Sequence, residues 1–225
     1  MSNQRYKKSE RSEFLSDNPL IIQDTDKESL LTDVNIARRM IPLIDEITDC
    51  TFEQVKNLYD ELIEQSNTQP IHVIVGSPGG DVRSMLGIMN LFLLSRAPIY
   101  TYIFGETFSA GSWIFLCGQR RFAPKTTLNT IMFHPMEFTR DDNVGNHISH
   151  LEYIKKLNTN LIKFTSEKTS IKVETLQKLT SSETYYFVGD EIFDNQLATD
   201  VLDSSDFWLS EKPSKKKVKR SLITD

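Results

Sequence analysis

Cysteine is scarce in this sequence, and no hydrophobic run is long enough to cross a lipid bilayer. Only two cysteines, Cys50 and Cys117, occur among 225 residues, which fits a reducing compartment and excludes a disulfide framework. Neither has the spacing of a metal ligand, so both are interpreted as packing residues and no metal site is expected. The N-terminus lacks the apolar segment of a secretory signal, so we expect a cytoplasmic protein with no membrane contact.

Outside the C-terminal segment, basic residues are also scarce relative to acidic residues. The net charge is −5, but six basic residues lie together between residues 212 and 220. Without these six, 20 Lys and Arg residues face 31 Asp and Glu residues, a balance of −11. An acidic body of this kind argues against nucleic acid as a substrate. The basic tail is interpreted as a solvated end, with contact to an acidic partner as the alternative.

The sequence does contain one domain of ordinary size between two polar ends. Hydrophobic residues make up 39% of the chain and charged residues 25%, the composition of a globular protein. Residues 1–33 are polar and lack sustained periodicity, and residues 204–225 hold the basic tail, so the domain is expected over 34–203. Short apolar runs alternate with helical patterns there, which predicts an α/β domain with largely parallel strands.

Individual elements of this domain can be placed from periodicity and turn signals. Thr51 is expected to open the first helix, with Gln54 three residues later completing a capping box. The remaining elements are predicted from apolar runs and helical stripes: strands over 40–44, 71–75, 99–104 and 131–134, and helices over 82–94, from Ser109 onward, and over about 146–168.

Four short motifs occur in order along these elements. A proline-diglycine loop, 77–81, follows the strand over 71–75, and its glycines let a substrate backbone come close. Ser109 lies at a strand-to-helix turn, and His134 ends an apolar strand. Glu183 precedes an aromatic run that leads to the last helix.

The serine and the histidine suggest nucleophilic catalysis. A serine at such a turn has an exposed hydroxyl and free backbone N–H groups beside it, although most serines at helix starts are only N-caps. A serine hydroxyl needs a base to react at neutral pH, and a histidine can serve as that base. Ser109 and His134 are therefore the candidate pair.

In this order and spacing, the motifs resemble those of the ClpP family, the proteolytic subunit of the ATP-dependent Clp protease. The resemblance runs from about Arg38 to Asp203. It implies a crotonase-like spiral of β-β-α units and a serine endopeptidase with Ser109, His134 and Glu183 as catalytic residues. It further implies an oxyanion hole made by the backbone N–H groups of Gly80 and Ala110, with Gly79 shaping the substrate-binding loop.

The resemblance also implies partners. Family members form homo-oligomers, heptameric rings that can stack, and they enclose a chamber that receives polypeptides from an AAA+ Clp unfoldase ATPase. The helix over 146–168 would be the handle through which rings stack, and residues 20–22 would anchor the N-terminal segment. No metal or organic cofactor is implied.

One departure from the family pattern leaves alternatives open. The family has aspartate as the third catalytic residue, and Glu183 stands here. Glu183 can complete the triad, or the third role can be vacant or filled by another acid. The alternatives to an active peptidase are a weak or inactive structural subunit of a mixed ring, a CoA-using crotonase-fold enzyme, and a subunit used in viral particle maturation.

Overall fold

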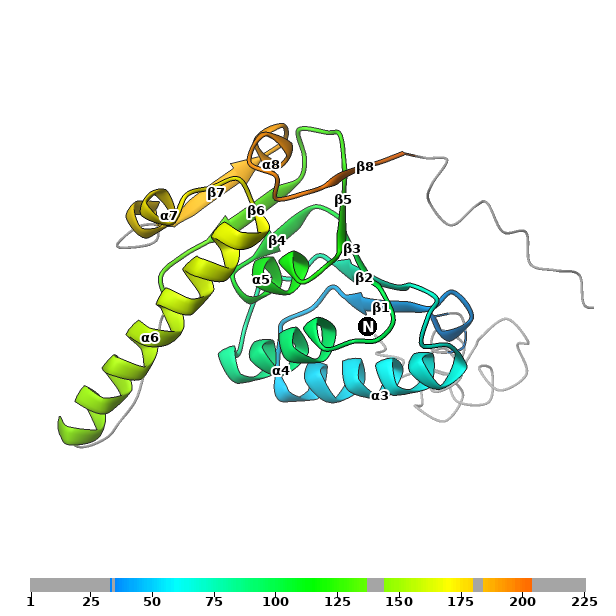
Figure 1. Cartoon of the computed structure of the whole chain (residues 1–225), viewed down its shortest axis with the longest axis horizontal. Coiled ribbons are helices and arrows are strands. Elements are labelled where there is room, and N and C mark those ends of the chain that lie inside the picture. Colours follow the sequence, from blue (N-terminus) through cyan, green and yellow to red (C-terminus); the bar gives the residue numbers. More distant parts are fainter. Residues whose placement is uncertain (1–32, 34, 137–143, 180–183, 204–225) are drawn as a thin grey trace, which may run out of the picture.

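Two β-sheets organise the chain (Figure 1). The computed structural model describes residues 33, 35–136, 144–179 and 184–203. The larger sheet has five strands in the order β1-β2-β3-β5-β8, and all of its pairings are parallel. These strands are β1 (Met40–Leu43), β2 (Ile71–Val75), β3 (Ile99–Ile103), β5 (Arg120–Pro124) and β8 (Asp200–Leu202). The predicted α/β class with largely parallel strands is confirmed.

The smaller sheet has three strands in the order β4-β6-β7. They are β4 (Glu106–Phe108), β6 (Thr130–Phe133) and β7 (Tyr185–Val188). β4 and β6 are parallel, so their carboxyl ends meet at one edge. β7 is antiparallel to β6, with Tyr185 opposite Phe133.

The helices cover these sheets unequally (Figure 1). α3 and α4 pack side by side below the larger sheet, and α5 lies between that sheet and α6. The C-terminal half of α6 packs on the body through buried Leu161 and Ile162, whereas its N-terminal half extends away from it. The bounds are α3 (Asp49–Gln65), α4 (Val82–Leu93), α5 (Ala110–Leu116), α6 (Val144–Lys168), α7 (Val173–Leu179) and α8 (Glu191–Asp194). In the described part of the chain, no helix combines the length and the apolar character that a membrane crossing requires.

The predicted start of the first helix is wrong by a few residues. Thr48, not Thr51, is the N-cap of α3, and its side chain accepts a hydrogen bond from the N–H of Thr51. The Thr51 hydroxyl oxygen in turn accepts from the N–H of Thr48 at 3.2 Å, so the two threonines form the capping box without Gln54. Thr48 and Thr51 are three residues apart, the spacing of a capping box, and the first of them is the N-cap in the structure.

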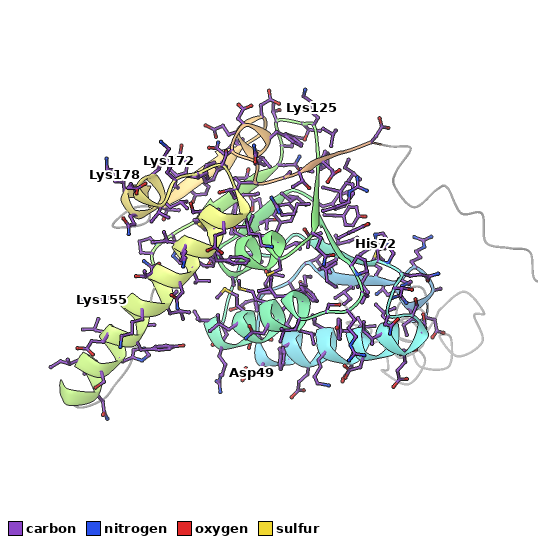
Figure 2. The ribbon with its side chains drawn as sticks, in the orientation of Figure 1. Asp49, His72, Lys125, Lys155, Lys172 and Lys178 are labelled. Atoms are coloured by element: carbon purple, nitrogen blue, oxygen red, sulfur yellow. The ribbon has the colours of Figure 1, made fainter. Side chains whose placement is uncertain are left out.

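His72 lies on β2, on the face of the larger sheet that points away from α3 and α4 (Figure 2). Its Nδ1 lies 2.7 Å from the hydroxyl oxygen of Tyr102. Burial lowers the pKa of His72, and the positive charge of Arg39 lowers it further. His72 is therefore an aromatic packing residue of the sheet, separate from Ser109.

A buried arginine ties the last segments of the chain to β5. The guanidinium of Arg121 is within hydrogen-bond distance of four backbone carbonyl oxygens, and the residue is only 5% exposed. Its acceptors are Leu197 at 2.7 Å, Lys168 at 2.6 Å, Gln196 at 2.9 Å and Gly118 at 3.4 Å. Burial lowers the pKa of Arg121, while Asp200 opposes that change.

Replacing Arg121 by methionine is expected to lower the free energy of unfolding by about 3 kcal/mol, because buried carbonyl groups lose their donors. Urea denaturation followed by circular dichroism measures this loss. The matched control is Arg83→Met, which removes a side chain that is 84% exposed and 3.8 Å from Asp49. That change should cost less than about 0.5 kcal/mol. Equal midpoints for the two variants would contradict a structural role for Arg121.

Candidate active site

Ser109 lies at a tight turn between β4 and α5. It adopts φ 53° and ψ −119°, a backbone conformation that is strained for a residue with a side chain. Although Ser109 occupies the N-cap position of α5, its side chain makes no capping hydrogen bond. Its backbone N–H donates instead to the carbonyl oxygen of Met132 at 2.9 Å. The turn thus leaves the hydroxyl available for another partner: Ser109 stands at the N-cap position of α5, but its side chain does not cap the helix.

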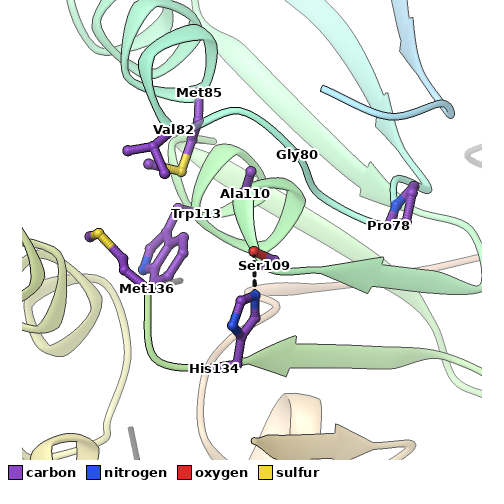
Figure 3. Close-up of a pocket in the computed structure, with 9 residues that line it drawn as sticks. All are labelled: Pro78, Gly80, Val82, Met85, Ser109, Ala110, Trp113, His134 and Met136. Carbon is purple, nitrogen blue, oxygen red and sulfur yellow. Dashed lines mark hydrogen bonds between the residues drawn. The ribbon is translucent and has the colours of Figure 1, made fainter. Parts of the chain in front are cut away.

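That partner is His134. The Nε2 atom of His134 lies 2.8 Å from the Oγ atom of Ser109 (Figure 3). His134 directly follows β6, and β6 runs parallel to β4 with Phe108 opposite Met132. The parallel pairing brings the two strand ends together, so the residues that follow them meet. A neutral imidazole at this distance can accept the hydroxyl proton and raise the nucleophilicity of the oxygen.

The diglycine loop packs directly against this pair. Gly79 and Gly80 have φ values of +106° and +146°, which residues with side chains rarely adopt. A Cβ atom on Gly79 would lie 2.7 Å from the Cβ of Ser109, and one on Gly80 would lie 2.2 Å from the carbonyl oxygen of Ile47. Only glycine therefore lets the backbone come this close to the serine.

Two backbone hydrogen bonds and a helix cap hold the loop in place. The N–H of Ile47 donates to the carbonyl of Gly79 at 2.8 Å, and the N–H of Asp81 donates to the carbonyl of Ile47 at 2.7 Å. The Asp81 carboxylate caps α4 by accepting from the N–H of Ser84 at 2.7 Å. This hydrogen bond, more than any other contact, keeps the pKa of Asp81 below its usual range.

The N–H groups predicted for the oxyanion hole belong to Gly80 and Ala110. Ala110 is the first residue of α5, so its N–H has no acceptor within the helix. Among residues 35–136, 144–179 and 184–203, none accepts a hydrogen bond from either N–H. Both amides therefore remain available to a bound oxygen close to Ser109.

A pocket of about 240 Å³ opens beside the serine (Figure 3). One side presents the polar groups of Ser109 and His134 together with the backbone of the diglycine loop. The other walls are apolar, which suits an apolar side chain next to the reacting bond. The apolar wall residues are Val82, Met85, Trp113 and Met136.

The structure brings together most of the residues predicted from sequence. Ser109, Ala110, Gly80 and His134 all line the pocket, and Gly79 contacts Ser109. Glu183, the predicted third catalytic residue, lies outside the described residues. The position of Trp113 in the pocket wall was not predicted from sequence, although a residue four positions after Ser109 on a helix lies on the same side as the serine.

The sequence also matches known proteins. Residues 25–205 match the family model described as Clp protease. Over 162 residues the chain is 25% identical to the ATP-dependent Clp protease proteolytic subunit 2 of Treponema denticola, covering 71% of this chain and 80% of that protein. These matches confirm the resemblance based on the motifs. With the successive units β3-β4-α5 and β5-β6-α6, they also confirm the crotonase-like spiral fold.

Proposed function

Because the chain belongs to the Clp protease family, we propose that it is a serine endopeptidase that uses Ser109 as nucleophile and His134 as general base. The 2.8 Å contact between Ser109 Oγ and His134 Nε2 is the observation that carries this proposal. His134 takes the hydroxyl proton as Ser109 attacks the peptide carbonyl, and then donates it to the departing amine. Water hydrolyses the resulting acyl-enzyme, with His134 again acting as base.

Gly80 and Ala110 stabilise the charge that forms on the carbonyl oxygen. Their N–H groups act as the two donors of the oxyanion hole, and one such donor is worth about 3 kcal/mol of transition-state stabilisation. Gly79 shapes the loop that receives the substrate. An extended polypeptide would add as a strand to the backbone beside Gly80 and His134. The apolar walls of the pocket would then receive the side chain that precedes the cleaved bond.

Glu183 is proposed as the acid that orients His134. In support, Tyr185, two residues after Glu183, pairs with Phe133, the residue before His134. Two residues of extended chain span at most about 7 Å, so the register is compatible with this role. If the third role is vacant instead, the chain would be a slow or inactive subunit of a mixed ring.

Oligomeric rings and a Clp ATPase partner are general properties of this family. We propose homo-oligomeric rings, heptameric and stacked, that enclose the active sites of domain 34–203 in a cytoplasmic chamber. An AAA+ unfoldase would supply unfolded polypeptides, and the peptidase itself would need no cofactor. The exposed apolar side chains on the N-terminal half of α6 support burial between subunits: Ile148, Leu151 and Tyr153.

Reaction with a fluorophosphonate probe tests the peptidase directly. We expect the assembled protein to become covalently labelled at Ser109, as located by peptide mass spectrometry, because the probe needs an activated hydroxyl. The variants Ser109→Ala and His134→Ala should remain unlabelled. An unlabelled wild-type protein would instead favour the structural subunit, and acyl-CoA binding without labelling would favour the CoA-using enzyme.

A further inference from the structure

Ser112 has a buried hydroxyl group that links both strands of the active site. The residue is fully buried, on the first turn of α5. Its Oγ lies 2.8 Å from the carbonyl oxygen of Thr107 on β4 and 2.7 Å from the carbonyl oxygen of Met132 on β6. The single hydroxyl proton of Ser112 is thus shared between carbonyl oxygens on two strands of the smaller sheet.

Both acceptors lie close to the catalytic pair along the chain. Thr107 is two residues before Ser109, and Met132 is two residues before His134. The Met132 carbonyl also accepts the hydrogen bond from the backbone N–H of Ser109 at 2.9 Å. The carbonyl oxygen of Met132 therefore accepts hydrogen bonds both from the Ser112 hydroxyl and from the backbone N–H of Ser109.

We propose that Ser112 is a positioning residue, which fixes the ends of β4 and β6 so that Ser109 Oγ stays within reach of His134 Nε2. This inference rests on the proposed peptidase function. Without the Ser112 hydroxyl, the Met132 carbonyl loses one hydrogen bond, and this carbonyl is the acceptor for the backbone N–H of Ser109. The strained backbone of Ser109 then has fewer contacts to oppose its relaxation.

A merely stabilising role would give a different result. The β4–β6 pairing from Glu106–Thr130 to Phe108–Met132 already joins the strands, so the loss of Ser112 should leave the sheet folded. Misplacement of reacting groups by about 1 Å can cost on the order of 10²-fold in rate. A positioning role therefore predicts a fall in kcat at temperatures where the variant is fully folded.

The experiment compares Ser112→Ala with Thr101→Val in the assembled protein. Thr101 is the matched control, because its buried hydroxyl donates to the Phe115 carbonyl at 2.8 Å, toward the other end of α5. Thermal unfolding measures stability, and a fluorogenic peptide gives kcat and KM. The rate of fluorophosphonate labelling reports the nucleophile without a substrate-binding step.

We expect Ser112→Ala to lower kcat and the labelling rate by about 10- to 100-fold, with KM changed less than about twofold. Thr101→Val should shift the melting temperature similarly and leave kcat within about twofold of the wild type. If Ser112→Ala does not assemble, Ser112→Cys fills the site with a slightly larger side chain that is a much weaker donor, and the same loss is expected.

Three results would overturn the inference, and the third is distinguishable from the first two. If the wild type is active, the positioning role alone is overturned when the Ser112 variant has an unchanged kcat. It is also overturned when the Ser112 and Thr101 variants lose kcat equally. A wild-type protein that neither hydrolyses peptide nor reacts with the probe overturns the peptidase proposal and this inference together.

Discussion

Replacing Ser109 by alanine is expected to lower peptide hydrolysis by about 10⁴-fold or more, because none of the other described residues that line the pocket carries a hydroxyl or thiol that could form the acyl-enzyme. The pocket keeps the other groups that line it, and the removed hydroxyl makes no capping hydrogen bond to α5. Relief of the strained turn is not expected, since alanine has the same restriction at φ 53°. Turnover of a short fluorogenic peptide by the purified, assembled protein measures the loss.

A control for this variant is Ser95→Ala. The hydroxyl of Ser95 donates to the carbonyl of Ala97 at 2.8 Å, in the connection between α4 and β3 and away from the pocket. Its loss should leave turnover unchanged. If Ser109→Ala retains wild-type turnover after contaminating proteases are excluded, Ser109 is not the nucleophile.

The second large effect is expected for Gly80→Ala. The added methyl group would lie 2.2 Å from the carbonyl oxygen of Ile47, a distance that forces the loop to move. The N–H of residue 80 would then leave its place beside Ser109. Losing one oxyanion donor costs about 10²- to 10³-fold in kcat. The measurement is kcat with the same fluorogenic peptide, on material whose assembly is checked by size-exclusion chromatography.

Gly105→Ala separates backbone strain from this catalytic effect. Gly105 also has a positive φ, +81°, but a Cβ atom there would have no neighbour within 4 Å. Alanine at this position should reduce stability by about 1 kcal/mol and leave kcat within about twofold of the wild type. A fully assembled Gly80→Ala protein with normal kcat would exclude the Gly80 N–H as an oxyanion donor.

The proposed catalytic pair could be predicted from sequence because His134 ends an apolar strand and Ser109 stands at a turn between the apolar run 99–104 and a helix. Strands of one sheet that run parallel bring such residues to one edge, and β4 and β6 place Ser109 and His134 there. The glycines were predictable for a similar reason, since a diglycine turn after a strand indicates backbone angles that other residues avoid. Glu183 stays a prediction.

Other features carry too little sequence signal. β4 has only three residues, too short for a strand period to be recognised between Gly105 and Ser109. β5 was not predicted, because it begins with two arginines, a residue type that does not indicate a buried strand. Arg121 is nevertheless buried, since the carbonyl groups that accept its hydrogen bonds come mainly from distant segments of the chain. The role of Ser112 was equally hidden, since both of its acceptors are backbone atoms, which any residue type supplies.

The residues proposed for catalysis are divided between the two sheets. Ser109 and His134 follow strands of the smaller sheet, whereas Gly79 and Gly80 follow β2 of the larger one. Near the site, the N–H of Phe108 donates to the carbonyl of Ser77 at 2.9 Å and joins the two parts. A slight rotation of one sheet against the other would thus displace the proposed oxyanion donor of Gly80 and leave the serine–histidine contact intact. A peptidase built in this way would lose activity while the contact between its serine and its histidine stayed intact.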